Sequence, residues 1–280
     1  MATRFASFVK PIAAQPGVCS VKRPSLRWWI DPRTIALGLL LPVTIVVAWS
    51  IAVRLEIMRP QILPSPLTVL ATARDLFVGG ELLAALGISL GRVVVGLAIG
   101  SLLGILVGIA TGRSRTIDAY FGPTIRGICQ IPTIAWLPFF MIVFGIGEGL
   151  KLALIAKASF LPLFVNTSAA MRAAPERFHE VADVLELDRW QRLRLVVLPA
   201  ALPLVASGFR MGLSNAWHVL VVVEMVAAAA GVGHLMAWSR TLFQLDAVFV
   251  TIVVIGITGW AMDATMRLIE SRLSPWTANA

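Results

Sequence analysis

Residues 84–111 read AALGISLGRVVVGLAIGSLLGILVGIAT, an apolar run interrupted by one charge, Arg92. About 20 apolar residues suffice to cross a hydrocarbon core roughly 30 Å thick as a helix. Similar runs occupy residues 34–53, 123–145, 152–171, 200–226 and 247–267. They lack the alternating pattern of barrel strands, and helices satisfy every backbone group in lipid. We therefore predict an all-α membrane protein with six transmembrane helices.

The composition also fits a chain that faces lipid. Hydrophobic residues make up 58% of the 280 residues and charged residues 14%, whereas about a quarter of the residues in soluble proteins are charged. The net charge of +9 would suit a nucleic-acid partner. The basic residues are scattered over loop ends, however, and form no recognition motif. We expect no nucleic acid among the partners.

The basic residues orient the predicted helices. Residues 1–33 carry six Lys and Arg against one acid, Asp31, and no signal-peptide pattern, so we interpret them as a cytoplasmic basic tail. Crossing six times from there puts few basic residues outside: Arg54, Arg59, Arg74, Lys151 and Arg240. Most of the others then lie inside, as the positive-inside rule requires. We predict a multi-pass inner-membrane protein whose termini are both cytoplasmic, with a C-terminal tail at 273–280.

Small residues predict where two helices touch. The second predicted span carries glycines at a regular spacing of four residues: Gly96, Gly100, Gly104 and Gly108. Such a ladder on one helix face lets another backbone approach closely. We expect it to serve helix packing.

Turn residues mark features around the spans. Ser65 and Pro66 fit a helix start and Gly79 its end, which predicts either a short amphipathic helix on the outer interface or a structured loop. Prolines interrupt the third and fourth predicted spans at Pro132, Pro138 and Pro162. Each kink either borders a pathway or only shapes packing.

The predicted cytoplasmic loop at about 172–199 has an apolar periodicity of its own. Residues 175–203 read PERFHEVADVLELDRWQRLRLVVLPAALP. Phe178, Val181, Ala182 and Leu185 share one face of a short helix, which suits docking into the groove of a partner.

This loop resembles the coupling segment of binding-protein-dependent ABC importer permeases. That pattern is Glu-Ala-Ala, three residues, Gly, nine residues, Ile, one residue, Leu-Pro, and this chain has Glu180, Ala182, Leu198 and Pro199 at the matching places. Glu186 occupies the glycine position, where a left-handed backbone costs a side chain on the order of 1 kcal/mol. The turn there is either reshaped or compensated by neighbouring contacts.

Residues 60–272 as a whole resemble the nitrate, sulfonate and taurine permease family. The matching stretches are 63–66 (LPSP), 89–92 (SLGR), 144–148 (FGIGE), 166–167 (NT) and 210–224. The resemblance implies a type I ABC importer (MetI-like) permease fold over residues 34–272. It also implies a second copy or a paralogue of the permease, cytoplasmic ATPase subunits, and an extracytoplasmic solute-binding protein.

We expect the chain to form the translocation pathway for a small anion of the nitrate, sulfonate, taurine or bicarbonate class. A vitamin precursor or an aromatic acid is an alternative substrate. A stand-alone secondary transporter is a further alternative, which the lack of visible internal repeats disfavours. The chain shows no P-loop, so ATP and Mg would belong to the partner ATPase, and we expect neither enzyme activity nor a cofactor in this chain.

Polar residues inside the spans are the candidates for the pathway, because an arginine there costs roughly 2.5–3.5 kcal/mol. For Arg92 the alternative is bonding to carbonyls of a kinked neighbour, and for Arg210 it is pairing with another span or subunit. Asn166 and His218 are also typical of hydrogen bonds between helices. The histidines lack metal-ligand spacing, so we expect no metal site. The full set of pathway candidates is Arg92, Lys157, Asn166, Arg210, His218 and Glu224.

Overall fold

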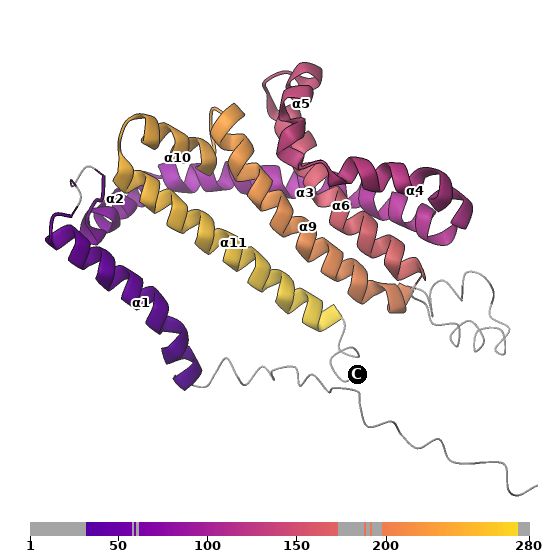
Figure 1. Ribbon diagram of the computed structural model, residues 1–280, viewed down its shortest axis with the longest axis horizontal. Helices are drawn as coiled ribbons and strands as arrows, with labels where there is room; N and C mark the ends of the chain where they lie inside the picture. Colours follow the sequence, from indigo (N-terminus) through magenta and orange to yellow (C-terminus); the bar gives the residue numbers. More distant parts are fainter. Residues whose placement is uncertain are drawn as a thin grey trace, which may run out of the picture. The chain divides into compact units, whose positions relative to one another are not determined.

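The computed structural model describes residues 32–57, 59, 62–172, 188, 191 and 198–273. Within these ranges every regular element is a helix (Figure 1). The chain divides into two compact units, the first ending at Ala52 and the second beginning at Val53. Most of α1 (Pro32–Arg54), an apolar helix with Pro42 inside it, belongs to the first unit. The remaining elements form the second unit.

The segment after α1 contains the predicted short helix rather than a structured loop. α2 (Pro66–Val78) begins with a proline in its first turn, and the Ser65 hydroxyl caps it by accepting a hydrogen bond from Thr68 N at 3.1 Å. Gly79 follows its last residue. None of its side chains is fully buried, and Leu67 and Leu70 are exposed.

Three helices build the centre of the second unit. α3 (Glu81–Arg113) packs along α6 (Glu148–Arg172), and α6 packs along α9 (Leu198–Ala227). α11 (Leu245–Leu273) runs beside α9 (Figure 1). Apolar side chains from α3, α6 and α9 form the core between them: Val93, Leu97, Ile155, Leu213, Ala216, Trp217 and Leu220.

The glycine ladder of α3 faces α6 directly. A β-carbon at Gly104 would lie 2.8 Å from the carbonyl oxygen of Phe160, and one at Gly108 would lie 2.7 Å from Cβ of Thr167. One at Gly100 would overlap the carbonyl oxygen of Ala156. The two helices therefore touch through their backbones, which only glycine permits at these positions.

The predicted third span is bent rather than continuous. α4 (Arg115–Gln130) ends before Pro132, and η2 (Thr133–Trp136) and α5 (Leu137–Phe144) continue at an angle of 93°. Ile131 adopts an extended backbone, which is the conformation that a following proline favours, and Pro132 has no N–H to donate. Pro138 lies in the first turn of α5, where a proline is tolerated.

Two other expected features differ from the sequence prediction. α6 continues without a break through Pro162. The fifth predicted span is followed by a separate helix, α10 (Val232–Thr241), which is inclined to α9 by 44°. Gly231 between them has φ +116°, a value that favours glycine.

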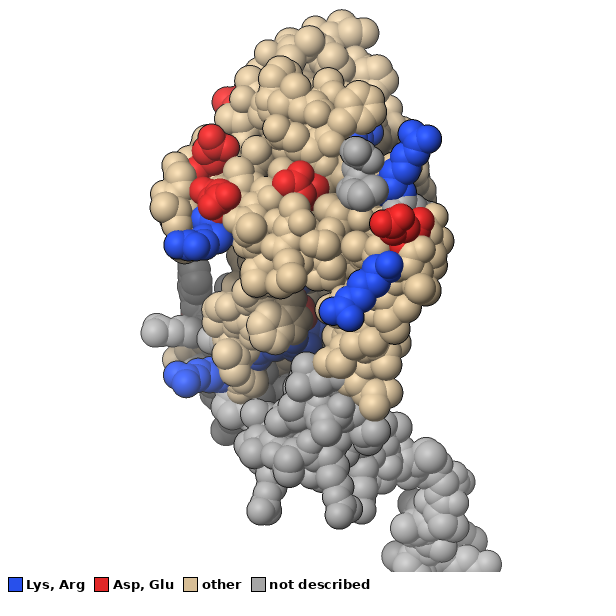
Figure 2. Space-filling view, turned by 90° about the vertical axis from the view of Figure 1, so that its left-hand side faces the viewer, with Lys and Arg blue, Asp and Glu red and all other residues tan. Residues whose placement is uncertain are grey.

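The apolar helices account for most of the predicted spans. α3, α6 and α11 are each long and apolar enough to cross a membrane, and the two bent pairs bring the number to five if each pair is one span. The apolar segment Leu40–Arg54 in α1 is shorter. The described residues thus support up to five spans, and the predicted sixth stays a prediction. On the face shown in Figure 2, uncharged residues predominate and charged ones form small groups.

Candidate functional site

A cluster of buried charges lies where α9 ends. Glu224 is 0% exposed, and Arg92 of α3, 8% exposed, donates from Nη1 to its Oε1 at 2.6 Å. The hydroxyl of Ser89, one turn before Arg92, lies 2.9 and 2.8 Å from the two carboxylate oxygens of Glu224. Buried charges are tolerated where they are paired and hydrogen-bonded. The predicted pathway candidates Arg92 and Glu224 therefore meet each other.

The same cluster holds the start of α10. Glu224 accepts a hydrogen bond from Gly233 N at 3.0 Å, and Ser89 Oγ accepts one from Val232 N at 3.0 Å. Arg92 Nη1 also donates to Ala230 O at 2.6 Å. The first N–H groups of α10, which have no partner within the helix, are satisfied by α3 and α9. A β-carbon at Gly231 would overlap the Glu224 carboxyl group.

Glu148 in the first turn of α6 completes the cluster. Its two carboxylate oxygens accept from Nε and Nη2 of Arg92 at 2.9 and 2.7 Å, and Lys151 Nζ lies 2.7 Å from Oε1. Two carboxylates thus compensate two cations. Arg92 therefore bonds mainly to two carboxylates and to one carbonyl, that of Ala230; its role in the pathway stays a prediction.

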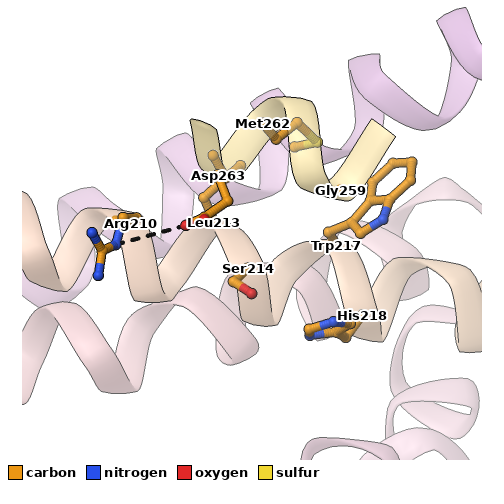
Figure 3. A pocket seen from close by; sticks show the side chains of 8 residues that line it. All are labelled: Arg210, Leu213, Ser214, Trp217, His218, Gly259, Met262 and Asp263. Carbon is orange, nitrogen blue, oxygen red and sulfur yellow. Dashed lines mark ion pairs between the residues drawn. The ribbon is translucent and has the colours of Figure 1, made fainter. Parts of the chain in front are cut away.

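Arg210 lies beside a small cavity between α9 and α11, of about 60 Å³ (Figure 3). Its Nη1 lies 3.0 Å from Glu270 Oε2, and its Nε lies 3.7 Å from Asp263 Oδ1. Arg210 thus pairs with two acids of α11 and also borders the cavity, so both interpretations of this residue stay predictions. Ser214, Trp217 and His218 line the same cavity.

Lys157 lines a larger cavity of about 200 Å³ at the bend between α4 and η2. Its Nζ donates to Ile131 O at 3.2 Å and lies 5.5 Å from the ring centroid of Trp136. The hydrogen bond supplies a donor to a carbonyl at the end of α4. Cation and ring are within the range of a cation–π interaction.

The remaining two pathway candidates differ in their setting. Asn166 donates from Nδ2 to Pro162 O at 2.8 Å, and a β-carbon at Gly208 of α9 would touch its side chain; it belongs to the packing of α6 against α9. His218 lines both the 60 Å³ and the 200 Å³ cavity. With the exposed neighbours Ser214 and Asn215, His218 forms what we term the α9 polar face.

Of the five predicted coupling residues, two lie within the described part of the chain. Glu180, Ala182 and Glu186 lie outside the described residues, and Leu198 and Pro199 are in the first turn of α9. Sequence reasoning missed the roles of Ser89, Glu148 and Gly231. Their signal was indirect: Ser89 stands three residues before Arg92, and Glu148 three residues before Lys151, spacings that place side chains on one helix face.

Residues 100–275 match the family described as "Binding-protein-dependent transport system inner membrane component". The chain belongs to this family. The permease is 36% identical to the putative aliphatic sulfonates transport permease protein SsuC of Bacillus subtilis (strain 168), over 85% of this chain and 87% of the relative. It is 34% identical to the taurine transport system permease protein TauC of Escherichia coli (strain K12), over 90% and 94%.

A further relative has a different named solute. The riboflavin transport system permease protein RibX of Chloroflexus aurantiacus (strain ATCC 29366 / DSM 635 / J-10-fl) is 34% identical over 87% of this chain and 91% of its own length. Among solved structures, a chain of the MetNI methionine ABC transporter in inward-facing conformations matches with a TM-score of 0.53. The match covers 70% of this permease and 95% of the MetNI chain, at 17% sequence identity. The predicted MetI-like importer permease fold is confirmed.

Proposed function

We propose that this permease forms the translocation pathway for organic sulfonates, the zwitterion taurine included, in an ATP-driven importer of the inner membrane. The observation that carries the proposal is its similarity, over 85% and 90% of the chain, to permeases named for aliphatic sulfonates and for taurine. Nitrate and bicarbonate, which the sequence left open, have no counterpart among the relatives described above.

The geometry of α9 supports a pathway along its exposed side. Ser214, Asn215 and His218 are exposed although they lie within an apolar helix. Polar residues in a span normally face a helix partner or a water-filled cavity. We infer that the α9 polar face lines the pathway and faces a second copy of the permease, since helices of the described chain leave it uncovered.

The energy source in this proposal is a partner. The loop at about 172–199, with Glu180 and Ala182 in its coupling pattern, would dock on cytoplasmic ATPase subunits that bind ATP and Mg. An extracytoplasmic solute-binding protein would deliver the substrate. Both termini of the permease would lie in the cytoplasm.

Uptake into proteoliposomes tests the proposal. The complex is purified through a tag on this permease, reconstituted, and supplied with its binding protein and labelled taurine or ethanesulfonate. We expect uptake that requires ATP on the side of the ATPase subunits and stops with a non-hydrolysable nucleotide. A permease that purifies without an ATPase, and whose uptake follows an ion gradient regardless of ATP, contradicts the proposal.

The riboflavin-named relative favours a second candidate, an aromatic vitamin. The same proteoliposomes distinguish the two, because labelled riboflavin and labelled taurine can be offered at equal concentration. ATP-dependent uptake of riboflavin without uptake of either sulfonate would replace the sulfonate assignment and leave the importer role intact.

A further inference from the structure

The structure distinguishes the basic residues within the predicted spans by their ion pairs; they are Arg92, Arg126, Lys157, Arg210 and Arg267. Arg267 lies 3.4 Å from Asp263. Arg92 is compensated by Glu148 and Glu224, and Arg210 by Asp263 and Glu270. Arg126 lies 2.6 Å from Asp118. Lys157 has no ion pair among the described residues, and its Nζ makes one hydrogen bond, to Ile131 O. An ammonium group has three donors, so two of them remain for another acceptor.

Neutral donors surround the cavity into which Lys157 faces. Thr133, Asn215 and His218 line it, and none of the described residues in its lining is Asp or Glu. A hydroxyl, an amide and an imidazole can each donate to an anion. An uncompensated cation with donors beside it has the chemistry of an oxyanion site.

The size of the cavity limits what it can hold. Its volume of about 200 Å³ lies below the roughly 300–1,000 Å³ of pockets for drug-sized ligands. One cation matches one negative charge, so a monoanionic headgroup such as a sulfonate fits better than a dianion. The cavity also borders the α9 polar face through Asn215 and His218.

We propose that the cavity lined by Lys157, Thr133, Asn215 and His218 is a transient binding site for the sulfonate headgroup of the transported solute. This inference rests on the proposed function and adds the residues that hold the substrate within the membrane. Because none of the described lining residues is an acid, the site holds the sulfonate end alone. The ammonium group of taurine gains no partner there and lies near the cation of Lys157, so ethanesulfonate binds at least as tightly as taurine.

Cys129 provides a reporter, because its side chain lines the same cavity. Its thiolate attacks the thiosulfonate sulfur of a methanethiosulfonate reagent, forming a disulfide and releasing methanesulfinate. A Cys19→Ser background removes the other cysteine. The anionic sulfonatoethyl reagent and the cationic trimethylammonioethyl reagent are then compared on the purified complex, each relative to its rate with a small free thiol.

We expect the anionic reagent to be favoured about tenfold over the cationic one, since a nearby unit charge in a partly buried site changes local ion concentrations by at least that much. Ethanesulfonate should slow labelling of Cys129 at least as much as taurine does. Lys157→Met should abolish the preference and the protection, and Lys157→Arg should restore both. Equal labelling by the two reagents in the wild-type complex, or unchanged protection in an assembled Lys157→Met complex, overturns the site.

The outcomes for the site and for the proposed function are distinguishable. Suppose that the wild type takes up sulfonates with ATP and that Lys157→Met changes neither labelling nor uptake. This result overturns the proposed binding site and leaves the proposed importer function intact. Absence of sulfonate uptake refutes the function, and the labelling ratio still reports on the cavity. If the Lys157→Met complex does not assemble, the test rests on the wild-type complex. There, a preference of Cys129 for the anionic reagent together with protection by sulfonates supports the site, and the absence of either overturns it.

Discussion

Arg92 of α3 and Glu224 of α9 form a buried ion pair, with 2.6 Å between Nη1 and Oε1. Through Ser89 and the N–H groups of Val232 and Gly233, the same pair fixes the first turn of α10. Removing Arg92 leaves Glu224 buried without a counter-charge, and removing Glu224 leaves Arg92 with only the exposed Glu148 as an ion-pair partner, whereas removing both residues leaves neither charge. The pair is therefore expected to behave as a unit.

Glu224→Gln should lower the free energy of unfolding by about 3 kcal/mol, within the range for breaking a buried pair. The amide keeps the size of the side chain but loses the charge that faces Arg92. The apparent melting temperature of the detergent-solubilised complex measures the effect. The control is Glu81→Gln at the exposed start of α3, which should cost below about 1 kcal/mol. The double variant Arg92→Met with Glu224→Met should lose less stability than the sum of the losses in Arg92→Met alone and Glu224→Met alone; additive losses would show that the two residues act separately.

Gly231→Ala should destabilise the α9–α10 junction by about 2 kcal/mol. The new β-carbon would overlap the Glu224 carboxyl group, and φ +116° is a strained conformation for alanine. Gly256→Ala on α11 is the matched control, because its β-carbon would meet nothing within 4 Å, and it should be neutral or slightly stabilising. Thermal unfolding compares the two, and equal melting temperatures would show that α10 can move away from Glu224 at little cost.

Gly100→Ala should separate α3 from α6 and destabilise the permease by about 1–3 kcal/mol, the usual cost of overpacking. The methyl group would collide with backbone atoms of Ala156, which cannot rotate away. Gly91→Ala on the same helix has open space within 4 Å and should be tolerated. Melting temperature and yield of the assembled complex measure both variants; a stable Gly100→Ala complex would argue against backbone contact at this level.

Arg210→Gln should cost about 0.5–1 kcal/mol, since the side chain is 34% exposed and solvent screens its ion pairs. The preference of Cys129 for the anionic reagent should stay unchanged, because Glu270 and Asp263 already compensate Arg210. The exchange Arg210→Glu with Glu270→Arg should recover part of the stability that Arg210→Glu loses. Loss of the anionic preference in Arg210→Gln would instead place Arg210 in the pathway.

Local patterns predicted the features that depend on neighbouring residues. The start and end of α2 follow from Ser65, Pro66 and Gly79, since capping is decided within one turn. Apolar runs likewise located the long helices, because lipid imposes their length. A four-residue glycine spacing marked the face of α3 that packs against α6.

Features that depend on distant contacts escaped sequence reasoning. The sequence indicated that Arg92 lies within a span, where an arginine costs free energy. Its partners Glu148 and Glu224 lie 56 and 132 residues away, and no local spacing connects them. Pro132 marked the position of an interruption but not the 93° angle, which neighbouring helices determine. Pro162 carries the same local signal and leaves α6 unbroken. Whether a basic residue is compensated is likewise a property of the folded chain, so the sequence listed both Lys157 and Arg210 as pathway candidates.

The direct backbone contact between α3 and α6 has a mechanical consequence. At Gly100 and Gly104, where backbone atoms of α6 lie against the glycines, no rotamer change can accommodate sliding of one helix past the other. We expect α3 and α6 to move together as one rigid body during substrate transport. The backbone would then bend outside this helix pair, at the turn before Pro132 and at the junction around Gly231. These two short segments would act as hinges.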